Sequence, residues 1–395
     1  MKKSLLSVVC LFLSLFLNAQ NNTFESELVE AKKGNVKSQS FVAGCYMYGI
    51  HGASVNYDEA VKWARTAAEK GDDYAQYLLG YAYYGGFGVV IDDRLSMEWY
   101  EKSAKQGRFS AQNNLATSYI RVEQNYNKAL EWYLKGVTNE KLAIESGRYR
   151  GPFKDSYRYY IGMCYFRQKK YKEAFKCFES EFQKHDGATY VYSLLAMEYC
   201  YRNGLGVKKS KKKSNKLMKA LIEQESGMIE NIEGQYYALW GIETDYGMAK
   251  LNYECAIRHG NATGNYGLAL LYMNGLGVEV DHEKAKECWS GYLKSKKNEN
   301  NDISYKRALH NLAICDYNIG ERLYKEKKYK KAFELLNEAA TNQFNPIPQA
   351  MRLLSAFYRY GHGDVVKKDS QKEKYWRKEA ARHNDAKALK ILKGF

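Results

Sequence analysis

The stretch AQYLLGYAYYGGFGVVIDDRLSMEWYEKSAKQG, residues 75–107, decides how this chain folds. A further segment, AQNNLATSYI, opens at Ala111, which is 36 residues after Ala75. Three identities recur at the same distance before the quoted stretch: Gly44 and Gly80, Trp63 and Trp99, Gly71 and Gly107. Self-similarity at a fixed period indicates a repeat protein, in which neighbouring units stack to bury the apolar faces that none can bury alone.

Each unit reads as an apolar-periodic helix, a Gly-x-Gly turn and a second helix that carries alanine and aromatic residues. Segments 199–214, 270–289 and 357–376 repeat this order. No strand pattern precedes the turns, and no Lys-Ser/Thr pair follows them as in a phosphate-binding loop. We therefore predict structural turns, where glycine supplies backbone angles that other residues avoid. The turns are Gly86/Gly88, Gly204/Gly206, Gly275/Gly277 and Gly361/Gly363.

Composition supports a helical chain. The 395 residues include only three prolines, while 45% are hydrophobic and 14% aromatic. This apolar fraction excludes a disordered protein, and the scarcity of proline disfavours many-turned all-β folds. One ordinary hydrophobic core rarely organises a chain of this length, so a repetitive all-α architecture is expected.

The pattern resembles the Sel-1-like repeat family, a relative of the tetratricopeptide repeats. The match is carried by Gly80, Tyr83, Gly86, Gly88, Val89, Asp92, Trp99, Tyr100, Ala104 and Gly107, and again by Ala269, Tyr272, Gly275, Gly277, Val278, Asp281, Lys284 and Ala285. Other units lack the turn and are similar to plain tetratricopeptide repeats, with Gly162 and Ala174, or Gly320 and Ala332, where that family packs its two helices. The resemblance implies a right-handed α–α superhelical solenoid with assembly or regulatory roles.

Four segments follow from this pattern. Residues 1–19 are predicted to be a signal peptide, 20–36 an N-terminal helix or cap, 37–382 a solenoid of about eight to nine hairpins, and 383–395 a C-terminal capping helix. A repeat is expected to start at Asn345-Pro346-Ile347-Pro348. The unit at Gly204 has lysines where others have an acidic residue, so its second helix is expected to begin late.

The predicted signal peptide places the mature chain outside the cytoplasm. Lys2 and Lys3 precede a thirteen-residue apolar run from Leu5 to Leu17, which is too short to span a bilayer, and cleavage is expected near Ala19. No later segment is apolar enough to cross a membrane. This leader and the Tyr-rich, Pro-poor usage suggest a Gram-negative bacterium, and hence the periplasm or beyond. The mature net charge is then (61 − 2) − 45 = +14.

Catalytic, metal and cofactor sites are not expected. The seven histidines never pair at metal-ligand spacing, and neither HExxH nor CxxC occurs. Ser210-x-x-Lys213 matches the serine motif of penicillin-recognising enzymes only formally, because no companion motif follows. The seven mature cysteines are expected to be free, packed as small apolar side chains. A cell-wall or β-lactam hydrolase is the least favoured alternative.

A lysine cluster offers another alternative, binding of an anionic envelope component such as an acidic glycan or lipid phosphate. Its lysines are contiguous rather than interleaved with aromatic residues, so a nucleic acid is not expected as partner. The cluster, called here the basic patch, comprises Lys208, Lys209, Lys211, Lys212, Lys213, Lys216 and Lys219.

The 36 tyrosines carry the favoured functional hypothesis. One set recurs three residues after the small Gly/Ala position and is predicted to pack: Tyr83, Tyr119, Tyr165, Tyr201, Tyr272 and Tyr358. In tetratricopeptide relatives the concave surface is lined by the residues that lie three before, one after and four after the small residue of the first helix. Carried over, these positions hold Phe41, Tyr48, Tyr77, Tyr81, Tyr84, Tyr159, Phe166, Tyr199, Tyr266, Tyr317 and Tyr324. Aromatic side chains suit capture of a protein or peptide, so we predict a non-catalytic scaffold or adaptor.

Overall fold

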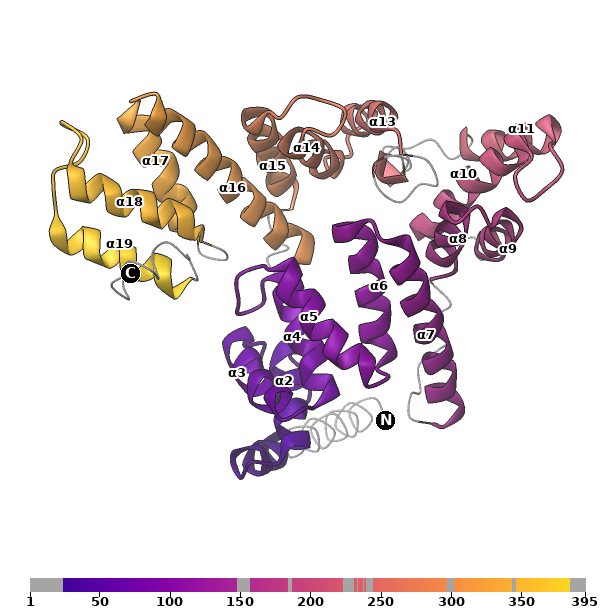
Figure 1. The fold of residues 1–395 in the computed structure, drawn as a ribbon, viewed down its shortest axis with the longest axis horizontal. Helices are drawn as coiled ribbons and strands as arrows, with labels where there is room; N and C mark the ends of the chain where they lie inside the picture. The colour runs from indigo at the N-terminus through magenta and orange to yellow at the C-terminus, as the bar shows by residue number, and fades with distance from the viewer. Residues whose placement is uncertain are drawn as a thin grey trace, which may run out of the picture. The chain divides into compact units, whose positions relative to one another are not determined.

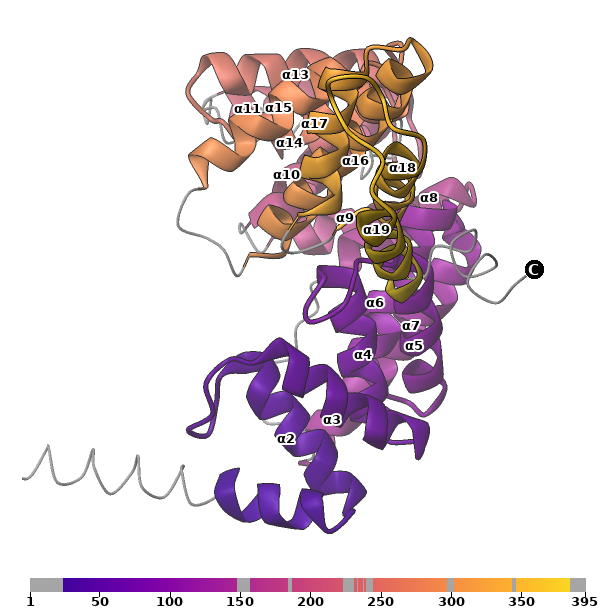
Figure 2. The ribbon, with the colours of Figure 1, turned by 90° about the vertical axis from the view of Figure 1, so that its left-hand side faces the viewer.

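The structure is a computed structural model. It describes residues 24–147, 157–183, 187–222, 231–232, 234–236, 238, 244–296, 302–342 and 346–383. The predicted signal peptide, and all of the predicted C-terminal helix except His383, lie outside these residues. The chain divides into two compact units, Met1–Asp155 and Ser156–Phe395, and the helices of each can be followed in Figures 1 and 2.

The first unit stacks antiparallel helical hairpins, which Figure 1 draws from indigo to purple. A short helix over 24–32 precedes them, and its Phe24 and Ala31 pack against Val42 and Cys45. The three hairpins are α2 (Val36–Tyr48) with α3 (Tyr57–Glu69), α4 (Asp73–Gly85) with α5 (Asp93–Lys105), and α6 (Phe109–Glu123) with α7 (Tyr126–Glu145).

The second unit continues the same architecture. Its hairpins are α8 (Arg158–Arg167) with α9 (Tyr171–Phe182), α10 (Gly187–Asn203) with α11 (Lys211–Ile222), α14 (Gly264–Asn274) with α15 (His282–Ser295), α16 (Ile303–Lys325) with α17 (Tyr329–Ala340), and α18 (Pro348–Tyr360) with α19 (Ser370–Arg382), while α13 (Tyr246–Arg258) packs on α14. The described residues form no strand, only a lone bridge between His362 and Val366. The predicted all-α solenoid of helical hairpins is confirmed, and a repeat does start at Pro348.

One backbone hydrogen bond closes each of these eight hairpins. The residue that precedes the second helix donates its N–H to a carbonyl in the last turns of the first helix, over 2.9–3.0 Å. This bond uses a carbonyl near the end of the first helix, where C=O groups have few or no partners within the helix. The donor and acceptor pairs are Asn56 and Tyr46, Asp92 and Tyr83, Asn125 and Tyr119, Lys170 and Tyr165, Ser210 and Tyr201, Asp281 and Tyr272, Lys328 and Leu323, and Asp369 and Tyr358.

Small residues bring the two helices of a hairpin together. A Cβ atom on Gly80 would lie 2.5 Å from the ring of Tyr100, which is buried on α5. A Cβ on Gly162 would lie 2.7 Å from Phe178, and one on Gly320 would lie 2.9 Å from Leu336. The predicted roles of Gly162 and Gly320 in helix packing are therefore confirmed.

The Gly-x-Gly turns are structural, as predicted. All eight glycines have positive φ, from 56° at Gly363 to 75° at Gly204. In every turn except the last, the second glycine also packs on the preceding helices, since a Cβ on Gly88 would lie 2.5 Å from the Tyr57 carbonyl oxygen, whereas one on Gly363 would meet nothing within 4 Å. At Gly206 the corresponding distance to the Tyr171 carbonyl oxygen is 2.2 Å.

The expectation that the helix after Gly204 begins late is wrong. Ser210 takes the place of the acidic N-cap, and its hydroxyl accepts a hydrogen bond from the Lys213 N–H at 3.3 Å. Helix α11 begins at Lys211, five residues after Gly206, which is the same interval that separates Gly88 from the start of α5. A serine caps a helix about as well as an aspartate, so the lysines do not delay it.

The cysteines pack as small apolar side chains in the helices. Cys45, Cys164, Cys200 and Cys315 are buried, while Cys177, Cys255 and Cys288 are half-buried. Burial raises the pKa of Cys164 and of Cys200 to about 12. Thiols held in this protonated form are poor nucleophiles.

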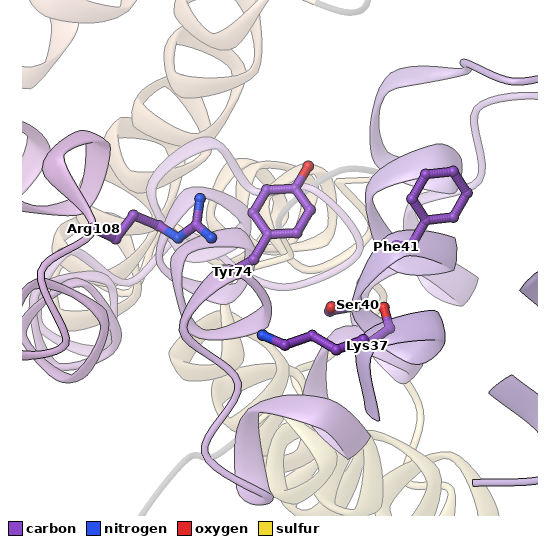
Figure 3. Close-up of a pocket in the computed structure, with 5 residues that line it drawn as sticks. All are labelled: Lys37, Ser40, Phe41, Tyr74 and Arg108. Carbon is purple, nitrogen blue, oxygen red and sulfur yellow. Dashed lines mark hydrogen bonds between the residues drawn. The ribbon is translucent and has the colours of Figure 1, made fainter. Parts of the chain in front are cut away.

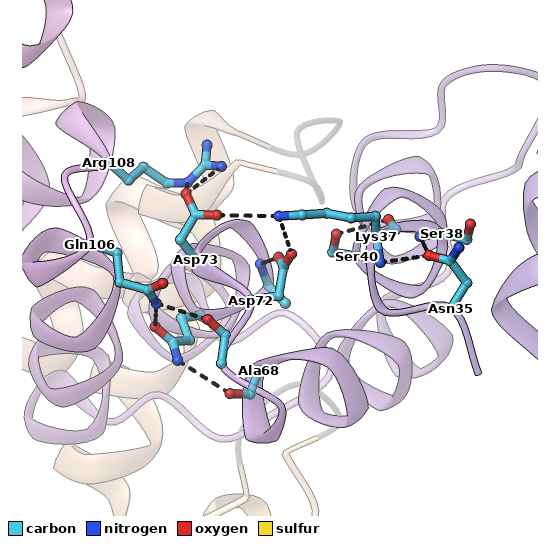
Figure 4. A network of polar contacts seen from close by, with 12 residues as sticks. Asn35, Lys37, Ser38, Ser40, Ala68, Asp72, Asp73, Gln106 and Arg108 are labelled. Atoms are coloured by element: carbon cyan, nitrogen blue, oxygen red, sulfur yellow. Dashed lines mark hydrogen bonds and ion pairs between the residues drawn. The ribbon is translucent and has the colours of Figure 1, made fainter.

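A row of glutamine side chains joins the hairpins of the first unit. Each is buried near the start of a first helix and donates its amide to a carbonyl at the end of the preceding helix. The bonds run from Gln39 to Ala31, from Gln76 to Ala68 and from Gln112 to Ala104, at 3.0–3.2 Å. The carbonyl oxygen of Gln76 also accepts from the Gln106 amide at 2.8 Å (Figure 4).

Gln76→Leu should lower the free energy of unfolding by about 1–1.5 kcal/mol, because it removes a buried hydrogen bond to the Ala68 carbonyl, which keeps the Gly71 N–H as a backbone donor. Gln106→Leu breaks the same side-chain pair from its exposed end, where water replaces the lost bonds. It should cost less than about 1 kcal/mol. Urea unfolding followed by circular dichroism compares the two variants. Equal losses would show that the Gln76 bond adds nothing specific.

Candidate protein-binding surface

The predicted surface residues of the first unit lie on its first helices, and three of them meet. The ring centres of Tyr48 and Tyr81 are 6.0 Å apart, and those of Tyr77 and Tyr81 are 6.4 Å apart and nearly parallel. Tyr48 at the end of α2 is 40% exposed, which leaves its face open to a partner. Tyr77 and Tyr81 on α4 are half-buried.

Two further aromatic residues extend this group, and the sequence reasoning missed both. Tyr74 stacks one turn before Tyr77 at 6.2 Å, and Phe87 in the glycine turn stacks on Tyr81 at 5.0 Å. Tyr74 could have been found by continuing the helical spacing of Tyr77 and Tyr81 by one turn towards the N-terminus. Tyr48, Tyr74, Tyr77 and Tyr81 are called here the tyrosine cluster.

The hydroxyl groups of the tyrosine cluster stay protonated. Burial raises the pKa of Tyr74 and of Tyr81 to about 12, and nearby tyrosines add to the shift. Burial also raises the pKa of Tyr48 and of Tyr77, which share a hydrogen bond. The cluster therefore offers neutral hydroxyl groups and broad ring faces, the combination enriched at protein interfaces.

Phe41 and Tyr84 flank the cluster. Phe41 on α2 packs against His51, with ring centres 5.2 Å apart. The guanidinium of Arg121 lies 4.9 Å from the ring centre of Tyr84 and forms a bidentate pair with Asp93, at 2.7 and 3.0 Å. Tyr84 is thus held by a cation that is itself fixed.

In the second unit the structure brings two of the predicted residues together. The ring centres of Phe166 on α8 and Tyr199 on α10 are 6.1 Å apart, in an edge-to-face arrangement. Both are half-buried. The guanidinium of Arg202 lies 5.4 Å from the ring centre of Tyr199.

Three other predicted residues of the second unit are half-buried and engaged within their own hairpin or the next. Tyr266 packs against Trp289 at 4.9 Å and Tyr292 at 5.2 Å, both on α15. The Tyr317 hydroxyl donates to Glu321 at 2.9 Å. Tyr324 contacts Tyr329, Phe357 and His362, with ring centres 5.1–5.7 Å away.

Tyr159 is not a surface residue, and its assignment to the binding face is corrected. Its side chain is fully buried, with ring centres of Phe178 and Tyr192 at 5.6 and 5.3 Å. Counting positions from Gly162 placed it on the inner face. The large aromatic residues of α9 and α10 close over that position instead, so Tyr159 belongs to the core.

A cavity of about 360 Å³ adjoins the tyrosine cluster at Tyr74. Lys37, Ser40, Phe41, Tyr74 and Arg108 line it (Figure 3). Two of these residues form ion pairs with aspartates at the start of α4: Lys37 with Asp72 and Arg108 with Asp73, each at 2.8 Å (Figure 4). The sequence reasoning did not single out these charged residues, because they are isolated charges at three different helix starts.

All seven lysines of the basic patch are exposed, on the loop after Gly206 and on α11. Lys213 lies 4.9 Å from the ring centre of Tyr201. The same arrangement recurs at Lys128 and Tyr119, and at Lys284 and Tyr272, at 4.9 and 5.3 Å. Part of the basic patch thus has a structural role that other hairpins share.

The described residues contain neither a metal-binding cluster nor a membrane-spanning helix. No group of three His, Cys, Asp or Glu side chains among them is arranged to bind a metal ion. In the same part of the chain, every helix is too short or too polar to span a bilayer.

The chain matches a known family. The family model of the Sel1 repeat matches seven segments, which together make up more than half of the chain: 36–72, 73–107, 110–139, 190–226, 262–290, 306–344 and 348–385. All of the tyrosine cluster lies within the first two.

Two curated relatives are similar over part of the chain. A putative sel1-like repeat-containing protein, L21, of Acanthamoeba polyphaga mimivirus is 30% identical over 141 residues, which are 35% of this chain and 23% of that protein. Chitin synthase regulatory factor 3 of Schizosaccharomyces pombe is 36% identical over 89 residues, which are 22% of this chain and 10% of that protein. This chain thus spans less than a quarter of either relative.

Two solved structures align over most of the chain. One is c5321, a protective antigen of uropathogenic Escherichia coli with an SLR fold, at 23% identity and a TM-score of 0.39 over 93% of this chain and 81% of that chain. The other is a Sel1 repeat protein from Oxalobacter formigenes, at 18% identity and a TM-score of 0.36 over 96% and 93%.

His362, which packs against Tyr324, makes stability depend on pH. Burial lowers the pKa of His362 below its ordinary value of 6.5, so the unfolded chain takes up the proton at higher pH than the folded chain. The free energy of unfolding should therefore fall as the pH decreases below about 6.5.

His362→Phe should remove the contribution of His362 to this loss of stability, because phenylalanine does not titrate. The substitution should be tolerated, since Phe87 occupies the equivalent position in the turn Gly86-Phe87-Gly88. Urea unfolding at pH 8 and pH 5 measures the effect. The variant should lose less stability than the native chain between these two pH values. Identical losses would contradict the assignment.

Proposed function

Because the chain belongs to the Sel1 repeat family, we propose that it is a non-catalytic scaffold that binds a protein or peptide partner through aromatic residues on its first helices. Proteins built from this repeat generally mediate protein–protein interactions and are typically not enzymes. The observation that carries the proposal is the contact of Tyr48, Tyr77 and Tyr81 across two neighbouring hairpins.

The tyrosine cluster has the properties of an interaction hot spot. Its rings are fixed by their neighbours, since Tyr77 also contacts the buried Tyr100 with ring centres 6.0 Å apart. A pre-ordered tyrosine gives a large contact area at little cost in conformational entropy. The half-buried positions keep part of each ring accessible. In the second unit Phe166 and Tyr199 provide a smaller surface of the same kind.

The residues that formally match a catalytic or phosphate-binding motif have structural roles. Ser210, the serine of the formal penicillin-recognition motif, caps α11. The second glycines Gly88, Gly206 and Gly277 pack on the preceding helices. One relative is by its name a regulatory factor, which agrees with a protein that acts by binding another.

Export completes the proposal. The leader at residues 1–19 motivates it, and it places the partner in the periplasm or outside a Gram-negative cell. The mature chain purified from its native source should then begin at Gln20. N-terminal sequencing or intact mass measurement tests this. A mass that includes residues 1–19 in a soluble fraction would contradict export by cleavage.

The binding proposal is tested in native cells by crosslinking and co-purification. Tyr48→Ala and Tyr81→Ala should each reduce recovery of the crosslinked partner about tenfold or more, because loss of a hot-spot aromatic residue costs about 2 kcal/mol or more. Tyr375→Ala is the matched control, since this tyrosine is 55% exposed on a second helix, α19. Thermal melting by circular dichroism confirms that each variant is folded.

The basic patch supplies the competing outcome. A combined Lys→Gln variant at 208, 209, 211, 212 and 216 keeps Lys213 over Tyr201. It should bind the partner as the native chain does. If this variant loses binding, if binding also falls steeply with salt and if the tyrosine variants bind normally, then an anionic glycan or lipid is the ligand.

A further inference from the structure

The cavity beside the tyrosine cluster joins three hairpins of the first unit. Lys37, Ser40 and Phe41 come from α2, Tyr74 comes from α4, and Arg108 immediately precedes α6. Figure 3 shows the Arg108 guanidinium beside the Tyr74 ring, the Lys37 amine below that ring, and Phe41 on the other side of Tyr74 from Arg108. The lining therefore places two cations next to two aromatic rings.

Lys37 faces outwards and its carboxylate partner Asp72 faces inwards, whereas Arg108 and its partner Asp73 are exposed to a similar extent. The Lys37 side chain is 79% exposed, whereas the Asp72 side chain that it bonds is 1% exposed. Asp72 is also occupied as the N-cap of α4, where it accepts from the Ala75 N–H at 2.9 Å. Asp73, in the first turn of α4, is 28% exposed. Neither aspartate lines the cavity, so its charged lining is positive.

Donors remain for a ligand. Arg108 uses Nε and Nη2 for Asp73, each at 2.8 Å, and its Nη1 has no hydrogen-bond partner among the described residues. Lys37 carries three donors, and among the described residues its Nζ donates one hydrogen bond, to Asp72 at 2.8 Å. The hydrogen bond with Asp72 raises the pKa of Lys37, so this amine stays charged.

Tyr74 adds an apolar wall. Gly44 leaves room for it, since a Cβ there would lie 2.7 Å from the Tyr74 hydroxyl oxygen. The Arg108 guanidinium lies 4.8 Å from the Tyr74 ring centre. Tyr74 also stacks on Tyr77 at 6.2 Å, which makes the cavity continuous with the tyrosine cluster.

We propose that this cavity binds a carboxylate of the partner peptide, with an adjacent apolar side chain against Phe41 and Tyr74. The proposal rests on the scaffold function above and names the chemistry of the segment bound. Lys37 and Arg108 hold the carboxylate by charge-assisted hydrogen bonds. The carboxylate comes from an Asp or Glu side chain or from a free C-terminus.

The test uses a random library of ten-residue peptides, made with free and with amidated C-termini and screened against the purified full chain. Selected peptides should be enriched in Asp or Glu, or should require a free C-terminus, next to a Leu, Ile or Phe. Loss of binding on amidation identifies the C-terminal carboxylate. Binding that survives amidation identifies the side chain.

Selected peptides are then titrated by fluorescence polarisation against three variants. Lys37→Gln and Arg108→Gln should each weaken binding about tenfold, the loss expected for one charged hydrogen bond. Tyr74→Phe leaves the ion pairs and the ring in place and should bind the peptides as the native chain does. Lys105→Gln is the control, because Lys105 is an exposed lysine paired with Glu101 on α5.

Two results would overturn the assignment. One is a library that yields no peptide, or peptides without a carboxylate preference. The other is equal affinity for the native chain, Lys37→Gln and Arg108→Gln. If peptides selected without that preference lose binding on Tyr81→Ala, the scaffold function stands and only the carboxylate site fails.

Discussion

The fold depends on one backbone hydrogen bond, which runs from the residue before each second helix to a carbonyl near the end of the first helix. It recurs in the eight hairpins whose two helices are both described, although the donor is an Asn, Asp, Ser or Lys. Because backbone atoms make this bond, the side chain at the donor position can vary, as Ser210 and Lys170 show. With the hairpin closed at a fixed point, residues at a given distance from the small glycine recur on the same helix face. The tyrosine cluster owes its alignment to that regularity.

Much of the fold could be predicted from the sequence, because glycine and proline report local geometry directly. Gly162 and Gly320 mark close helix contacts, and Pro348 begins α18. The start of α11 could not be predicted from the missing acidic residue, since Ser210 supplies the same cap. The buried amide of Gln76 also escaped prediction, because its acceptor on Ala68 belongs to another hairpin.

The candidate site was predictable only in part, for a related reason. Helical spacing identifies residues that share a face, and it correctly grouped Tyr77 and Tyr81. It does not show what covers that face, so Tyr159 was assigned to the surface although Phe178 and Tyr192 enclose it. Helical spacing also does not predict that Lys37 and Arg108 line the same cavity, because they come together only when three hairpins stack. Properties of one helix are readable from sequence, whereas those created by stacking require the structure.

Site-specific photo-crosslinking tests the central claim, that the first-helix aromatic surface contacts a partner. A benzoylphenylalanine replaces Tyr48 in one variant and Leu134 on α7 in another, since these side chains are 40% and 42% exposed. Irradiation of native cells should give a discrete protein adduct from position 48 and none from position 134. Adducts from position 134 alone, or from neither position while the chain still co-purifies with its partner, would contradict the account.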